Sequence, residues 1–312
     1  MIQAVGEAFC STANLGAGFD VFGLALGRFC DRVRIRLNRG EKIRITVSGK
    51  YSVGIPQYVD RNSAGPPARA LLRRAGLRRG LEIFIQKNVP QGLGLGSSGA
   101  TAAACAKCLD HLLQLDLSND ELVQTASLGE RAVTGAAHAD NVAASLLGGF
   151  VIVYDNPVRA VSIRPPKELK IVVAVPMLPS RKDKTRQARK LVPRKLATSK
   201  AVLNIGRASA IVAGFASGDV ERIGSGMMDE IAEPYRTKSV PGYAEVKKAA
   251  LDANAAGVSI SGAGPSVVAL VDRSQHDPET VANAMTKAFA RSKVRSRTFI
   301  TDPAPPARIV QR

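Results

Sequence analysis

The residues best suited to chemistry are four glycines and two serines in the stretch NVPQGLGLGSSGATAAACAKCL (88–109), where an alanine-rich helical pattern begins. The amino end of a helix leaves backbone N–H groups without helical partners and carries a partial positive charge. Glycines let such a backbone approach an anion closely and adopt positive φ. Ser97 and Ser98 stand where the helix begins, to cap it or to offer hydroxyls to a phosphate or its metal ion. A tight turn with a serine cap is the alternative, but it needs fewer glycines, so we predict a phosphate-binding loop.

Three common phosphate loops differ from this one. A Walker loop ends in GK[ST], whereas Gly96 is followed by Ser97. The segment GLGSSG (94–99) fits the dinucleotide pattern GxGxxG, but that fold requires an acidic residue at the end of a second strand, and Asp116 directly follows the first helical pattern. A protein-kinase glycine loop requires an HRD segment downstream, and the sequence contains none.

Five segments in order along the chain point to another kind of loop. They are STANLGAGFDVFGLAL (11–26), PQGLGLGSSGA (90–100), LGERAVTG (128–135), HADNVAASLLGG (138–149) and ISGAGPSVVAL (260–270). Together they resemble the signatures of the GHMP small-molecule kinases, and the first and fourth are similar to the versions found in the homoserine kinase branch of that family. Each segment alone is moderate evidence, whereas four of them, 11–26, 90–100, 138–149 and 260–270, in order and with suitable spacing are strong evidence, and 128–135 adds to it.

The resemblance implies an α/β (α+β) fold with two domains. An N-terminal ATP-binding domain is expected over residues 1–160 and a ferredoxin-like C-terminal domain over residues 161–312. The implied activity is transfer of the γ-phosphate of ATP, with Mg²⁺, to the hydroxyl of L-homoserine in threonine biosynthesis. A cytoplasmic homodimer is also implied. The alternatives are a GHMP kinase for another small alcohol, such as shikimate or mevalonate, and a non-catalytic sensor with the same fold.

By the same resemblance, the nucleotide binds along the glycine loop. The implied residues are Asn62, Pro90, Gln91, Gly92, Leu93, Gly94, Leu95, Gly96, Ser97, Ser98, Gly99 and Ala100. Gly99 stands where alanine is usual, a mild departure that keeps a small residue beside the phosphate. Ser98 and Glu130 are expected to hold Mg²⁺, a hard cation that keeps several waters and takes few protein oxygens. The alternative for Glu130 is an exposed helix glutamate paired with a lysine or an arginine.

The resemblance also implies where the amino-acid substrate binds. The residues are Asn14, Asp20, His138, Asn141, Arg189, Arg236, Gly262 and Gly264. Asp20 is expected to face the substrate ammonium, while a guanidinium suits the carboxylate because its donors form a fixed fork. Arg186 lies close enough in sequence to compete with Arg189 for that role. A second glycine turn, at 262–264, is expected to face the first.

Asn141 distinguishes branches within the resemblance. Mevalonate-type and galactose-type members carry an aspartate at this position, whereas homoserine kinases carry asparagine. An amide cannot accept a proton near neutral pH. The implied catalytic residues Asn141, Asp20 and Glu130 therefore act by positioning and electrostatic stabilisation, which suits the loose transition state of phosphoryl transfer.

The elements that must position these residues form a mixed pattern of strands and helices. Strands are expected at 33–37, 42–47, 81–86, 148–154, 170–175 and 295–300, with two more around the second glycine turn. Helices are expected at 66–76, 97–115, 196–216, 242–254 and 278–291. Ser118 precedes Glu121 by three residues, which is a helix-capping signal. Prolines favour a boundary near 155–168 and a proline-rich tail after the last strand.

Composition narrows the class of protein further. The net charge of +18 is compatible with nucleic acid, anionic substrates or a generally basic surface, and few aromatic residues lie near the basic runs, which weakens the case for single-strand binding. We expect no nucleic-acid partner. No apolar run approaches the roughly 20 residues that cross a bilayer. The four cysteines, Cys10, Cys30, Cys105 and Cys108, lack the ligands of a zinc site, so we expect small buried residues, with metal and redox roles as alternatives.

Overall fold

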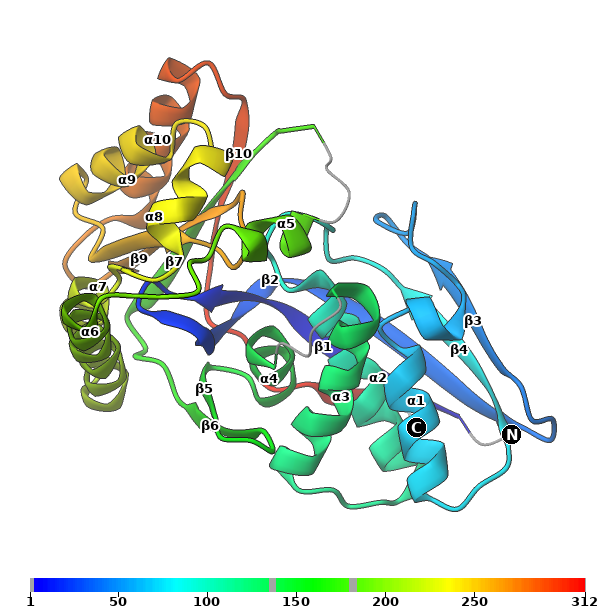
Figure 1. Ribbon diagram of the computed structural model, residues 1–312. Helices are drawn as coiled ribbons and strands as arrows, with labels where there is room; N and C mark the ends of the chain where they lie inside the picture. Colours follow the sequence, from blue (N-terminus) through cyan, green and yellow to red (C-terminus); the bar gives the residue numbers. More distant parts are fainter. Residues whose placement is uncertain (1–2, 135–138, 180–183, 312) are drawn as a thin grey trace.

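The chain forms two β-sheets with helices packed on them, in a computed structural model that describes residues 3–134, 139–179 and 184–311 (Figure 1). The first sheet follows the order β11-β1-β2-β4-β3, with β5 on β2 and β6 on β5. Its strands are β1 (Gln3–Asn14), β2 (Gly18–Asn38), β3 (Ile43–Ser48), β4 (Gly80–Gln86), β5 (Phe150–Tyr154), β6 (Arg159–Ile163) and β11 (Arg308–Gln311). The long strand β2 pairs with β4 through residues 32–38 and with β5 through residues 22–24, so it connects the two arms of the sheet.

Four helices cover one face of the first sheet: α1 (Gly65–Arg74), α2 (Ser97–Leu113), α3 (Asn119–Thr134) and α4 (Asp140–Leu147). The alanines of α2 let this helix lie deep among its neighbours. A Cβ on Gly6 of β1 would lie 2.5 Å from the Ala104 carbonyl oxygen, so the strand must carry glycine where α2 crosses it. The expected capping signal is confirmed, because the Ser118 N–H donates to Glu121 at 3.0 Å and the Glu121 N–H donates to the Ser118 hydroxyl at 3.3 Å.

The second sheet follows the order β10-β7-β9-β8 and is antiparallel throughout. Its strands are β7 (Leu169–Pro176), β8 (Gly257–Ile260), β9 (Val267–Asp272) and β10 (Ser296–Thr301). One face packs on α9 (Tyr243–Asp252) and α10 (Pro278–Arg291), and the other on α6 (Thr198–Ser217) and α7 (Val220–Ser225). This is the strand order of a ferredoxin-like fold, so the expected two-part α/β architecture is confirmed.

A continuous apolar core joins the two sheets. Leu24 and Phe150 of the first sheet belong to the same buried cluster as Val173 and Leu270 of the second. The ring of Phe150 stacks on that of Phe215 in α6, with centroids 3.9 Å apart. The cavity described below is therefore held between two halves that share buried apolar contacts.

Two segments that contain prolines continue the first sheet. The segment expected as a boundary contains β6, which pairs with β5 through Tyr154 and Arg159 and spans the predicted division between residues 160 and 161. The proline-rich tail does not leave the fold, because β11 pairs antiparallel with β1 through Gly6 and Ile309. The tail is held by backbone hydrogen bonds to β1, which is distant in sequence, so its own composition does not predict this strand.

The burial of the cysteines and the length of the helices test the expectations on metal sites and membrane spans. Cys10, Cys105 and Cys108 are buried as expected, whereas Cys30 is only partly buried. Burial raises the pKa of Cys10 and of Cys108 to about 12, so both are thiols at neutral pH. Throughout the described ranges, no three His, Cys, Asp or Glu side chains gather to hold a metal ion, and no helix is long and apolar enough to cross a membrane.

Candidate active site

One cavity of about 950 Å³ collects most of the residues that the sequence singles out. The predicted site residues in its lining are Asn14, Asp20, Asn62, Gln91, Gly92, Gly94, Leu95, Gly96, Ser97, Ser98, Glu130, Asn141, Arg189, Arg236, Gly262 and Gly264. They come from both halves of the molecule. Two groups can be distinguished: the loop side, formed by residues 91–98 with Glu130, and the charged side, formed by Asp20, Arg189 and Arg236.

Four predicted residues that the structure describes are not among those lining the cavity. Pro90, Gly99 and Ala100 are buried, and Leu93 packs against the apolar core that joins the sheets. Gly99 lies against α4, because a Cβ there would come within 3.2 Å of the Asn141 carbonyl carbon. These four residues therefore support the loop on the side that faces the protein core. His138 lies outside the described residues.

The loop side owes its shape to glycine. Gly92, Gly94 and Gly96 have φ of +67°, +78° and +59°, which L side chains rarely adopt. A Cβ on Gly94 would lie 2.2 Å from the Ser261 carbonyl oxygen, so the second glycine turn presses directly on the first. The Ser261 hydroxyl also donates to the Gly94 carbonyl at 2.6 Å. The two turns therefore face each other, as expected.

The two serines at the start of α2 have separate surroundings. Gly96, not a serine, occupies the position before the helix, and no side chain caps it. The Ser97 hydroxyl instead donates to the Val89 carbonyl at 2.9 Å and ties the end of the loop to its beginning. The Ser98 hydroxyl hydrogen-bonds Glu130 of α3. The amino end of α2 thus adjoins the cavity without a side-chain cap, beside the Ser98 hydroxyl and the Glu130 carboxyl group.

Glu130 is a buried carboxyl group, not the exposed helix glutamate of the alternative interpretation. Its residue is 6% exposed, and burial raises its pKa to about 7. The negative charge of Asp140 also raises this pKa, whereas the hydrogen bond with Ser98 and the positive charge of Lys87 lower it. A carboxyl group with such a pKa becomes fully ionised when a cation arrives beside it.

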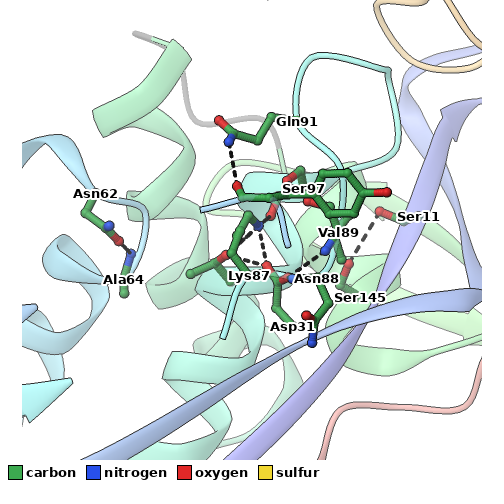
Figure 2. A network of polar contacts seen from close by, with 12 residues as sticks. Ser11, Asp31, Asn62, Ala64, Lys87, Asn88, Val89, Gln91, Ser97 and Ser145 are labelled. Carbon is green, nitrogen blue, oxygen red and sulfur yellow. Dashed lines mark hydrogen bonds and ion pairs between the residues drawn. The ribbon is translucent and has the colours of Figure 1, made fainter. Parts of the chain in front are cut away.

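Lys87 and Asp31 are buried polar residues that the sequence expectations missed. Lys87 lines the cavity and forms an ion pair with Asp31, whose side chain is completely buried (Figure 2). Burial lowers the pKa of Lys87, while the negative charges of Asp31 and Glu130 raise it. The one sequence signal was a lysine at the end of the β4 run LEIFIQK, directly before the glycine loop.

Asn141, at the start of α4, has its amide held in one orientation. The Ser11 hydroxyl donates to Asn141 Oδ1 at 3.0 Å, and Asn141 Nδ2 donates to Asp140 Oδ1 at 3.3 Å. Burial raises the pKa of Asp140 to about 6, and the charge of nearby Asp20 acts in the same direction. Asn141 also lies at the loop, since a Cβ on Gly96 would approach its Oδ1 to 2.8 Å. This amide therefore adjoins both sides of the cavity.

The charged side brings opposite charges together from distant segments. Arg189, in α5 (Lys184–Lys190), forms an ion pair with Asp20, and the guanidinium of Arg236, in α8 (Glu233–Arg236), lies 5.1 Å from the Phe19 ring centroid. Arg189 approaches the same ring at 5.7 Å. Arg186 also lines the cavity, but its side chain is exposed, and among the described residues Asp20 pairs with Arg189.

Arg236 and Asn14 are tied into the second glycine turn. Arg236 is 5% exposed and donates to the Gly262 carbonyl at 3.2 Å and to the Ala188 carbonyl at 3.3 Å. Asn14 Nδ2 donates to the same Gly262 carbonyl at 3.0 Å, and its Oδ1 accepts the Asp20 N–H at 3.2 Å. Both hydrogen bonds of Asn14 thus orient protein groups, a positioning role in addition to the substrate contact that was expected.

Asn62 lies in the wall of the cavity near the start of α1. Its Nδ2 donates to the Pro56 carbonyl at 2.6 Å. Its Oδ1 accepts the Ala64 N–H at 3.0 Å (Figure 2). The residue is 2% exposed, so its side chain fixes the loop that leads into the helix. The two prolines that follow occupy the first turn of α1, where a missing N–H costs little.

Comparison with known proteins agrees with this geometry. Residues 62–149 match the model of the GHMP kinases N-terminal domain, and residues 211–291 match that of the GHMP kinases C-terminal domain. This chain belongs to the GHMP kinase family. The first match contains the glycine loop, Glu130 and Asn141, and the second contains Arg236 and the second glycine turn.

Individual relatives cover nearly the whole chain. It is 41% identical to a homoserine kinase of Aeropyrum pernix over 99% of this chain and 98% of the relative. It is 40% identical to a homoserine kinase of Thermoplasma acidophilum over 96% of this chain and 94% of the relative. The crystal structure of homoserine kinase from Cytophaga hutchinsonii superposes with a TM-score of 0.90 at 34% identity, over 99% of this chain and 98% of that one.

Proposed function

We propose that this GHMP kinase transfers the γ-phosphoryl group of ATP to the hydroxyl of L-homoserine, giving O-phospho-L-homoserine for threonine biosynthesis. The observation that carries the proposal is the charged side of the cavity, where a carboxylate and two guanidiniums lie beside a phosphate-binding loop. An amino acid carries one ammonium and one carboxylate, so these groups complement it. The names of the relatives point to the same substrate.

The loop side binds the ATP phosphates in this proposal. Gly94, Gly96 and Ser98 line the cavity at the start of α2, where backbone N–H groups and the helix dipole would favour negative charge. Glycine permits this approach because no Cβ intervenes. The wall around Asn62 would receive the remainder of the nucleotide.

The donor set also fits Mg²⁺. Ser98 offers a hydroxyl oxygen and Glu130 a buried carboxyl group beside it, and hard oxygen donors of this kind suit Mg²⁺. When bound, Mg²⁺ would neutralise charge on the transferring phosphate. The protein contributes the placement of these two oxygens beside the loop.

The charged side orients the acceptor. Asp20 would bind the substrate ammonium, and Arg236 with Arg189 would bind its carboxylate. Asn141, whose amide is fixed by Ser11 and Asp140, would then orient the substrate hydroxyl toward the phosphate. No carboxylate stands at position 141 to accept the proton, so rate enhancement arises from placement and charge stabilisation.

A cytoplasmic homodimer is part of the proposal, and it is supported by the family resemblance alone. Sedimentation equilibrium of the purified chain tests the assembly, since a mass near the 32.9 kDa of one chain would contradict a dimer. Localisation of a tagged chain in its host tests the compartment.

The deciding experiment is ADP release from MgATP with L-homoserine, and with L-threonine, shikimate and mevalonate in parallel. Release with L-homoserine, together with a phosphomonoester signal in ³¹P NMR, is the expected result. Release only with another alcohol would overturn the substrate and the roles of Asp20 and Asn141. Silence with every alcohol in a chain that still binds ADP would favour the sensor.

A further inference from the structure

A buried ion pair lies behind the glycine loop and contacts both of its ends. We propose that Asp31 and Lys87 are positioning residues that hold the loop in its phosphate-binding shape. Neither residue belongs to the motifs that identify the family in this sequence. The inference rests on the proposed nucleotide site and adds to it the groups that set its geometry.

Asp31, on β2, fixes the beginning of the loop. Its Oδ1 accepts the N–H groups of Asn88 at 2.8 Å and Val89 at 2.9 Å, the two residues that follow Lys87 (Figure 2). Its Oδ2 accepts the hydroxyl of Thr101 at 2.6 Å. One carboxylate thus binds backbone before the glycines and a side chain of α2 after them. Asp31 is fully buried and does not line the cavity, so any effect on a nucleotide must pass through other residues.

Lys87 fixes the end of the loop. Its ammonium donates to the Ser97 carbonyl at 2.5 Å and to the Thr101 hydroxyl at 2.8 Å, and it completes its three donors with Asp31. The Ser97 carbonyl belongs to the first turn of α2, directly before Ser98. The position of the start of α2 therefore depends on the side chain of Lys87, the residue that directly follows β4.

Between these anchors, contacts from other segments hold carbonyl groups of the loop, since the Ser261 hydroxyl donates to Gly94 at 2.6 Å and the Ser11 N–H donates to Leu95 at 3.3 Å. Gly92, Gly94 and Gly96 lack side chains and have positive φ, and glycine loses more conformational freedom on folding than other residues. The hydrogen bond from Ser97 to the Val89 carbonyl closes the base of the loop at 2.9 Å. Asp31 and Lys87 hold residues 88–89 and the first residue of α2 at a fixed separation. The glycine backbone between them can then surround a phosphate.

A buried ion pair is a poor device for stability alone. Desolvation of two charges offsets much of their attraction, and apolar residues of similar volume often serve a fold equally well. Here, however, the two charged groups together satisfy two backbone N–H groups, one backbone carbonyl and one hydroxyl of the loop and its helix. An apolar pair would stabilise the core and leave the loop without these anchors.

The test compares nucleotide affinity with stability in Lys87→Met, Asp31→Asn and the double variant Asp31→Asn/Lys87→Met. ADP affinity is measured by calorimetry in EDTA, so that no metal ion or acceptor contributes, and stability is measured by thermal unfolding. Each single variant should bind ADP about 10- to 100-fold more weakly, as expected for lost hydrogen bonds to charged groups. The double variant should unfold at a higher temperature than Asp31→Asn, because no lysine is left buried without its partner, yet its ADP affinity should stay low.

A matched control is Lys107→Met, which removes a partly exposed lysine paired with Asp110 on the same helix α2. It should leave ADP affinity unchanged. Hydrogen exchange at the Asn88 and Val89 amides gives a second measure, and it should become faster in Asp31→Asn.

Three outcomes would overturn the inference. Wild-type affinity in Lys87→Met would show that the loop keeps its shape without the pair. Weak binding in Lys87→Met with normal binding in Asp31→Asn would make Lys87 a direct nucleotide ligand. Recovery of both stability and ADP affinity in the double variant would reduce the pair to a structural role. Failure of the proposed function is distinguishable, because it would appear as no turnover of L-homoserine by the wild-type chain, whereas failure of the nucleotide site would appear as no ADP binding by the wild-type chain. Should Asp31→Asn fail to fold, the contrast between Lys87→Met and the double variant still decides.

Discussion

The two sides of the cavity are built in contrasting ways. Apart from Glu130, the loop side is one contiguous stretch of backbone whose shape comes from glycine φ angles and from the buried Asp31 and Lys87. The charged side consists of side chains from segments far apart in the sequence, with Asp20 on β2, Arg189 on α5 and Arg236 on α8. Backbone donors recognise any phosphate, whereas opposed side-chain charges recognise a particular acceptor.

This contrast suggests that specificity and nucleotide binding can be separated by mutation. The loop side should tolerate little change, because a Cβ on Gly94 or Gly96 would overlap neighbouring atoms. The charged side should accept changes that alter which substrate binds and leave the loop intact. The variants below test this separation.

Glu130→Gln should have the largest effect, a loss of kcat on the order of 100- to 1000-fold, since it removes several kcal/mol of charge stabilisation at the transferring phosphate. ADP affinity in EDTA should remain near that of the wild type, because the amide keeps the shape of the carboxyl group. The control is Glu121→Gln on the same helix α3, which changes an exposed capping residue. Equal turnover in Glu130→Gln and the wild type would remove Glu130 from the loop side.

Asp140→Asn should change how stability depends on pH. Burial raises the pKa of Asp140 from 3.8 to about 6, so the folded state binds this proton more tightly than the unfolded chain. Its contribution favours the folded state fully below pH 3.8 and is lost as the pH rises through about 6. Relative to wild type, the variant should therefore gain up to about 3 kcal/mol in free energy of unfolding between pH 4 and pH 7.

Urea unfolding at pH 4, 5, 6 and 7 measures this difference for Asp140→Asn. Parallel pH profiles of the two proteins would show that Asp140 titrates normally and that the carboxylates near the charged side do not influence each other. The hydrogen bond from the Asn141 N–H can be accepted by the new amide oxygen, so the start of α4 should be retained.

The loop side was predictable from sequence because its determinants are local. Glycines at positive φ, a helix that begins with two serines, and the Ser118–Glu121 cap all depend on residues close together in the chain. Strand and helix patterns followed the same local rules, so the five expected helices lie within a few residues of their observed bounds, whereas β1 and the first half of β2 were not expected. Roles on the charged side came only through family resemblance, since nothing local connects Asp20 with Arg189.

What the sequence did not reveal depends on strand register. Asp31 lies beside Lys87 because β2 and β4 pair with Arg32 opposite Gln86. This register depends on which residues of each strand face the core, and the two strands are far apart in the sequence. The pairing of β11 with β1 likewise depends on contacts between the two ends of the chain. Such residues look unremarkable in sequence, since a lysine or aspartate in a strand is usually exposed.

Arg236→Met should separate the two sides of the cavity. The KM for L-homoserine is expected to rise about 10- to 100-fold, because a buried charge-assisted contact with the substrate carboxylate is lost. ADP affinity should stay within error of wild type. Arg222→Met, at an exposed position in α7, is the matched control. Loss of ADP affinity in Arg236→Met would show that the second glycine turn, which Arg236 contacts at Gly262, transmits changes to the loop side.

The smallest effect is expected from the arginines of α5. Arg189 and Asp20 form an ion pair that is 41% and 34% exposed, and solvent-exposed pairs contribute at most about 1 kcal/mol. Arg189→Gln should therefore raise the KM for L-homoserine by less than about tenfold, and the increase should shrink at high salt. Arg186→Gln should change neither KM nor its salt dependence, since Arg189 is the arginine that contacts Asp20. The reverse result would assign the substrate carboxylate to Arg186, and it would mean that the charged side rearranges when an amino acid binds, whereas the loop side stays in the shape fixed by its glycines.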